Sequence, residues 1–261
     1  MIARRFLLVV LHIDAILEEV TICRRRKKLE EVAQGNGLSD AYTASLARLR
    51  GQKGTKSLLG MKVLMWVLYS ERLLRAEELC HALGVEIGST HLDPDNIPAL
   101  RTLLSSCQGL VTVEASSSTV RLVHFTLQEH LLSTPTLFHN PHSTIAEVCL
   151  TYLNFRCLWD LSTPNSVPPR MPLQEYASCY WGTHTRRDMT ENAKKLARSF
   201  LNRQATQCGL QPQGQIALDL GGDDMCAVSE ETHRGSPANP QPSGPMHLKN
   251  VSYRYCKCCI L

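Results

Sequence analysis

The sequence predicts a mostly α-helical protein that contains a winged helix-turn-helix, with a helical segment before it and further helices and a disordered tail after it. Apolar residues recur at helical spacing in three successive segments near residues 58–69, 76–83 and 97–104. Two short stretches, 110–114 and 119–123, then alternate between apolar and polar residues as β-strands do. Three helices followed by a β-hairpin are the elements of a winged helix-turn-helix in their usual order.

Residues 1–55 are predicted to form a helical segment. Apolar residues near the start recur at helical spacing, which favours an amphipathic helix over about 3–20. A signal peptide is disfavoured because no small-x-small cleavage site follows. We interpret the basic run Arg24–Lys28 as the solvated face of a helix whose acidic residues lie within reach. Ser39 or Asp40 is then expected to cap a short helix.

The winged-helix domain is predicted to span residues 56–135. Its third helix is expected to open at Asp95 or Asn96, since both residue types suit the N-cap position. A further helix, from Thr126 through Leu131, follows the second strand. The apolar faces of the first three helices are expected to form the core, with the buried residues Trp66, Leu79, Leu100 and Leu103.

Residues 136–204 are predicted to form a C-terminal helical extension of the winged helix. Its expected elements are, in order, a helix over 144–155, a proline-rich turn over 164–172, a packed aromatic segment over 176–181 and a helix over 191–201 that Thr190 caps. After about residue 204 the apolar periodicity ends, and Gly, Pro, Ser and Gln dominate. This composition predicts that residues 205–261 are a low-complexity, disordered tail.

Composition narrows the class of protein and its compartment. The net charge is +4 over 261 residues, which is far less basic than a dedicated nucleic-acid-binding protein. No run of about 18 apolar residues occurs, which argues against a transmembrane helix. The 11 cysteines are odd in number and irregularly spaced, which favours free thiols over a disulfide framework. We therefore expect a reducing, cytoplasmic location.

Motifs for catalysis are missing from the sequence. The loop 51–57 resembles a P-loop, but Thr55 separates the second glycine from the lysine that should follow it directly. The G-x-S-x-G pentapeptide of serine hydrolases does not occur. Cys107 and His124 could suggest a thiol protease, but no residue supplies an oxyanion hole, and Cys107 is better interpreted as buried. The sequence thus predicts no catalytic residue and no enzyme.

Metal-binding motifs are similarly weak. Cys256, Cys258 and Cys259 are close together, but no second pair of Cys or His lies nearby to complete four ligands. His139 and His142 flank a proline in what we interpret as a solvent-exposed loop. We therefore predict no metal site and no cofactor.

Five segments carry a resemblance to a known family. They are LLGMKVLMWV at 58–67, LLRAEELCHAL at 73–83, TVRLVHFTLQEHLL at 119–132, IAEVCLTYL at 145–153 and YASCYW at 176–181. Together they resemble the winged-helix region that follows the NACHT nucleotide-binding module in fungal NLR-like (STAND) ankyrin-repeat proteins. The winged helix domain named after GPI inositol-deacylase belongs to the same group. The similarity covers about residues 3–203.

The resemblance implies a control element that folds onto a nucleotide-binding core and helps to hold its ADP-bound resting state. His124 matches the family's histidine that faces the ADP phosphates, with Gln128 and Glu129 following on the same helix. His130 departs from the pattern, because the family usually has an aromatic residue there. His124 could equally cap the corner between the wing and the next helix, and both interpretations stay open.

The leading hypothesis is a non-enzymatic regulatory and protein-interaction module, a truncated member of this family without its nucleotide-binding core. Its partner would be a protein, and a NACHT nucleotide-binding core is one candidate. The alternative is a DNA-binding winged-helix protein. Arg101 is the only cation of the third helix, and Arg121 on the wing is accompanied by Glu114, so nucleic acid is the less favoured partner.

The last four residues, Cys258-Cys259-Ile260-Leu261, fit the C-a-a-X signal for prenylation of Cys258. Nearby basic residues and Cys256, a candidate for palmitoylation, could supply the second signal that stable membrane attachment needs. A chance cysteine four residues from the end is the other interpretation. A membrane partner is therefore expected only if this terminus is prenylated, which would make the protein peripheral to the membrane.

Overall fold

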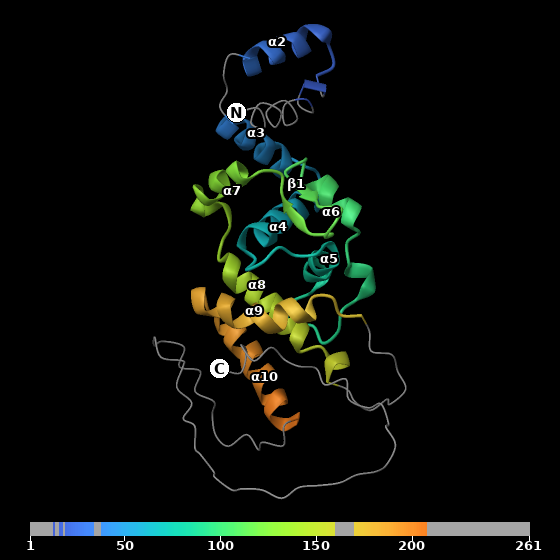
Figure 1. Ribbon diagram of the computed structural model, residues 1–261, viewed down its shortest axis with the longest axis vertical. Coiled ribbons are helices and arrows are strands. Elements are labelled where there is room, and N and C mark those ends of the chain that lie inside the picture. Colours follow the sequence, from blue (N-terminus) through green and yellow to red (C-terminus); the bar gives the residue numbers. More distant parts are fainter. Residues whose placement is uncertain (1–12, 14–15, 18, 34–37, 160–169, 208–261) are drawn as a thin grey trace, which may run out of the picture.

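The computed structural model describes residues 13, 16–17, 19–33, 38–159 and 170–207 (Figure 1). It is mostly helical, as predicted. The elements up to the wing are α2 (Ile22–Ala33), α3 (Leu38–Arg50), α4 (Lys56–Tyr69), α5 (Ala76–Gly84), the 3-10 turn Pro94–Asn96, α6 (Leu100–Ser106), β1 (Val111–Val113) and β2 (Val120–Leu122). The later elements are α7 (Phe125–Leu132), the turn Pro135–Leu137, α8 (Pro141–Leu153), the turn Arg156–Leu158, α9 (Gln174–Arg187) and α10 (Glu191–Gln207).

The predicted winged helix-turn-helix is confirmed. Helices α4, α5 and α6 are followed by the antiparallel wing β1–β2, in which Val111 pairs with Leu122 and Val113 with Val120. The segment between α4 and α5 adds to this sheet, because the Val120 N–H donates to the Leu74 carbonyl at 2.8 Å. The wing is therefore attached to the start of α5.

The core of the winged helix is built around α4, whose residues are apolar on most sides. Trp66 is 2% exposed, and Leu79 of α5 and Leu103 of α6 are 0% and 1% exposed. Gly60 lets α6 approach α4 closely: a Cβ atom at this position would lie 2.5 Å from the Ser106 carbonyl oxygen. A glycine is required here because the neighbouring backbone fills the place of a side chain.

The start of the third helix was predicted too early. Asp93 caps the short turn Pro94–Asn96, and α6 begins only at Leu100. Proline at position 98 disfavours the helical conformation of Ile97, which is extended with ψ 109°. Leu100 consequently lies at the edge of α6 and is only partly buried, against a groove of about 320 Å³ beside α5.

The helices after the wing form a second layer, in which α8 packs against α9 and α10 (Figure 1). Ile145, Cys149 and Tyr152 of α8 are each 0% exposed. The aromatic segment 176–181 is packed as predicted, and it lies within the longer helix α9. Thr190 caps α10 as predicted, since its hydroxyl accepts from the Ala193 N–H at 3.1 Å.

Other boundaries differ from the predicted ones. Helix α4 begins at Lys56, inside the predicted loop, and α10 extends to Gln207, past the predicted start of the tail. Helix α3 begins at Leu38, so Ser39 and Asp40 lie in its first turn. Residues 1–12, most of the proline-rich turn and the tail from 208, with Cys258, lie outside the described residues.

Helix α2 lies at one end of the long axis of the molecule, and α10 lies at the other (Figure 1). Arg24, Arg26 and Lys27 of α2 are exposed, as predicted for a solvated helix face. Within the described residues, no helix is both long enough and apolar enough to cross a membrane.

A buried ion pair fixes the turn that leads into α5. Glu78 is 1% exposed, and its two carboxylate oxygens each accept an N–H bond from the Arg72 guanidinium at 2.8 Å. The carboxylate also accepts the Arg75 backbone N–H at 2.7 Å. Burial raises the pKa of Glu78, but the hydrogen bonds from Arg72 and Arg75 outweigh it, so the pKa lies below its ordinary value. The N–H bond from Arg75 also satisfies a free donor at the helix start.

We expect Leu103→Asp to unfold the winged helix. An unpaired charge in this core costs several kcal/mol, which is comparable with the whole stability of about 5–15 kcal/mol. Leu100→Asp should cost less, because that side chain is only partly buried. Thermal unfolding followed by circular dichroism checks this, with the exposed Thr102→Asp as the control. Cooperative unfolding of Leu103→Asp at the wild-type temperature would contradict the core assignment.

Because the Glu78 carboxylate is held by hydrogen bonds, we expect the protein to lose stability in acid. Because its pKa is lower in the folded state than in the unfolded chain, its contribution is present above about pH 4.5 and is lost as the pH falls through the folded-state pKa. Glu78→Gln should remove about 1.5–3 kcal/mol at pH 7 and flatten this part of the pH profile. Denaturant titrations between pH 7 and 3 measure both effects. Glu77→Gln, in an exposed ion pair with Arg170, is the matched control and should change little.

Candidate functional site

The face that a DNA-binding winged helix uses carries little positive charge here. Helix α6 exposes Arg101, Thr102 and Ser105, and only the first of these is charged. On the wing, Arg121 forms an ion pair with Glu114, with 3.6 Å between Nη1 and Oε1. The wing tip, residues 115–118, is a polar turn without charge. This face therefore lacks the set of cations that phosphate contacts require.

His124 occupies the corner between β2 and α7. It is the N-cap of α7, and its Nδ1 accepts the Thr126 N–H at 3.2 Å and lies 2.8 Å from the Thr126 hydroxyl. That hydroxyl also meets the Tyr42 hydroxyl of α3 at 2.8 Å. The capping role considered for His124 is thus observed. Since Nδ1 acts as the acceptor, the proton is assigned to Nε2, for which the described residues show no partner.

Phe125 stands beside His124 and is largely solvent-exposed. The two ring centroids are 4.4 Å apart, and the Phe125 side chain is 63% exposed. An exposed phenylalanine at a helix start contributes nothing to the core, so this corner is a candidate contact surface. Gln128 and Glu129, which follow on α7, are also exposed.

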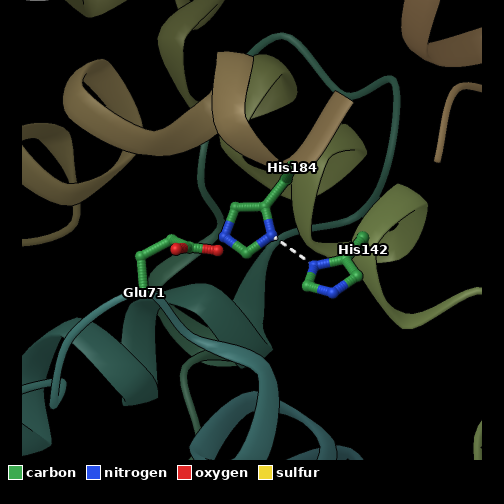
Figure 2. Close-up of side chains that lie close together, drawn as sticks. All are labelled: Glu71, His142 and His184. Atoms are coloured by element: carbon green, nitrogen blue, oxygen red, sulfur yellow. Dashed lines mark hydrogen bonds between the residues drawn. The ribbon is translucent and has the colours of Figure 1, made fainter. Parts of the chain in front are cut away.

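A second cluster was not predicted. Glu71 from the segment after α4, His142 from the first turn of α8 and His184 from α9 come together between the winged helix and the later helices (Figure 2). The Nδ1 atoms of the two histidines are 2.9 Å apart. One ligand atom from each of the three residues lies within 4.8 Å of the other two.

Tyr176 forms hydrogen bonds with two residues of this cluster. Its hydroxyl lies 2.9 Å from Nε2 of His184 and accepts the Glu71 backbone N–H at 3.1 Å. If His184 donates its Nε2–H to this hydroxyl, its Nδ1 carries the lone pair that accepts from Nδ1–H of His142. That assignment leaves His142 Nε2 as an acceptor, which suits the Arg187 guanidinium 3.5 Å away.

Charge in the cluster is balanced by Arg187. Its guanidinium forms an ion pair with the Glu71 carboxylate at 2.7 Å, and the Glu71 side chain is 17% exposed. Burial, the His142 imidazole and the Arg187 guanidinium lower the pKa of His184 to about 3. Burial and Arg187 also lower the pKa of His142. Both imidazoles are therefore neutral at pH 7, which is the form that binds metal ions.

The prediction that His142 is an exposed loop residue was wrong. Pro141 begins α8 instead of forming a loop, because proline is well accommodated in the first turn of a helix. His142 is thereby half-buried and faces His184, with its ring edge-on to Tyr69 at 5.4 Å. His139 is exposed in the preceding loop, as predicted. The only sequence signal for the cluster was a histidine within a packed aromatic helix.

Cys107 is buried as predicted, with 0% of its surface exposed. Burial raises the pKa of its thiol to about 12, so it is protonated at neutral pH and unsuited to act as a nucleophile. The cysteines at 256, 258 and 259 lie outside the described residues.

Comparison with known proteins identifies the central region. The family model of the winged helix domain of GPI inositol-deacylase matches residues 46–144. This match confirms the predicted resemblance of the winged-helix region, and it extends beyond residues 56–135 on both sides. Searches of curated proteins and of solved structures find no match. The chain thus contains a winged helix domain similar to that of this family.

Proposed function

We propose that this chain is a non-enzymatic regulatory and protein-interaction module that docks on a NACHT-type nucleotide-binding core. The observation that carries the proposal is the corner at the start of α7, where an exposed Phe125 stands beside a histidine whose Nε2 has no partner among the described residues. The low charge of α6 and the wing supports a protein surface over DNA as the target.

The two ring nitrogens of His124 allow two roles at once. Nδ1 caps α7 and fixes the orientation of the ring, and the Nε2–H is left to donate to an oxygen of the ADP phosphates held by the core. Phe125 would contribute apolar contact with the core around that hydrogen bond. The histidine would thereby favour the ADP-bound form of its partner, in keeping with the control role that the resemblance implies.

In this proposal the chain carries out no chemistry of its own. The sequence contains no P-loop and no nucleophile elbow, and one histidine does not replace a phosphate cradle. The name of the matched family refers to a deacylase, but the matched segment is its winged helix domain. The nucleotide site and the catalytic groups would come from the partner.

We expect His124→Ala to accelerate ADP dissociation from a complex of this chain with a NACHT module. Loss of a hydrogen bond to a charged phosphate is worth about 1.5–3 kcal/mol, or about 10- to 150-fold in the dissociation rate. Stopped-flow release of a fluorescent ADP measures it. Phe125→Ser should weaken docking itself, and His130→Ala on the same helix is the control. Equal ADP release with wild type and His124→Ala would leave only the capping role.

The DNA-binding alternative has one observation in its favour, the exposed basic residues Arg24, Arg26 and Lys27 of α2. We nevertheless expect no salt-sensitive shift of a random DNA duplex by the full chain at low salt. A shift that disappears steeply with added salt would show phosphate binding. If Arg101→Ala weakened that shift, the winged helix itself would be reading DNA, and the docking proposal would fail. If the shift were lost only when the basic residues of α2 are substituted, the DNA contact would be a nonspecific one made by α2.

A further inference from the structure

We propose that Glu71, His142 and His184 bind a divalent transition-metal ion of the zinc type, with one coordination position left for water. Two imidazole nitrogens and one carboxylate are a known ligand set for Zn²⁺, in which three protein ligands leave a fourth position open. The proposal is independent of the docking function, because the cluster lies apart from the α7 corner in the chain and uses none of its residues.

The distances suit such an ion after small movements. The two Nδ1 atoms are 2.9 Å apart, and two nitrogens bound to one tetrahedral Zn²⁺ would be separated by about 3.3 Å. The nitrogens would need to part by only a few tenths of an ångström. A ligand atom of Glu71 already lies within 4.8 Å of one ligand atom of each histidine. Figure 2 shows the Glu71 carboxylate beside the His184 ring, so a small movement of this side chain would bring it to the ion.

The surroundings of His184 resemble those of a metal-binding histidine. Histidine ligands usually donate their second ring N–H to a neighbouring acceptor, which fixes the ring. Here the Tyr176 hydroxyl occupies that place, 2.9 Å from Nε2, and directs Nδ1 toward His142. The same hydroxyl holds the backbone of Glu71 at 3.1 Å, so one residue positions two of the three ligands.

Arg187 currently neutralises the carboxylate that the metal would use. Its guanidinium lies 2.7 Å from Glu71 Oε1, but its side chain is 49% exposed and can turn into solvent when a dication arrives. Arg187 is therefore a competitor for the site. The bound ion would link the segment before α5 to α8 and α9, and so tie the winged helix to the helices that follow it.

Zn²⁺ titration of the full-length chain, followed by calorimetry and by thermal unfolding, tests the proposal. We expect one site per chain and, at a hundredfold excess over Kd, a rise of about 5–10 °C in Tm. Glu71→Gln and His142→Ala should each weaken binding more than about tenfold. Arg187→Met should strengthen it at least about threefold, since a neighbouring positive charge is removed. His139→Ala, the exposed neighbour, is the matched control and should bind as the wild type does.

Co²⁺ substitution separates this site from the cysteines. A nitrogen and oxygen ligand set gives only weak ligand-field bands, whereas thiolate ligands add intense charge-transfer absorption. A higher affinity of Arg187→Met for Zn²⁺ cannot result from misfolding. This variant therefore still tests the proposal if His142→Ala folds poorly. The proposal would be overturned if the wild-type chain did not bind Zn²⁺, or if only Arg187→Met bound it. It would also be overturned if Co²⁺ gave only thiolate absorption, or if His139→Ala and Glu71→Gln bound Zn²⁺ with equal affinity.

Discussion

The side chain of Tyr176 joins the winged helix to the helices that follow it. Its buried ring packs edge-on against Trp66 of α4 at 6.1 Å, and its hydroxyl contacts the Glu71 backbone and the His184 ring. The Arg72 guanidinium lies over the Tyr176 ring, 5.2 Å from its centroid, and that guanidinium also binds Glu78. One aromatic residue of α9 therefore supports the core, the start of α5 and the histidine cluster together.

The exposed side chains of this winged helix differ from those expected of a DNA-binding winged helix, although the order of its elements is the same. Of the positions that would meet phosphates on α6 and the wing, Arg121 is paired with Glu114, Arg101 is charged and exposed, and the other exposed positions of α6 are neutral. At the nearby start of α7, Phe125 is 63% exposed. A fold does not fix a function, which depends on the side chains it displays. The three residues of the histidine cluster come from other elements of the chain, namely the segment after α4, before the wing, and helices α8 and α9, after it.

Predictions made from local chemistry succeeded or failed at identifiable residues. The wing, the cap at Thr190 and the corner position of His124 were predictable because each depends on neighbours within a few residues. The start of α6 and the surroundings of His142 were mispredicted at prolines. Pro98 delays one helix and Pro141 begins another, and the same residue type permits both outcomes.

The sequence by itself determined the helices, the hairpin and the winged-helix identity of the middle of the chain, because hydrophobic periodicity and turn residues act over short distances. Only the tertiary structure decided the meeting of Glu71, His142 and His184, which are 71 and 42 positions apart along the chain. No spacing rule connects residues on three separate elements. Their proximity depends on the packing of α8 and α9 against the winged helix, which is fixed by buried contacts such as that between Trp66 and Tyr176.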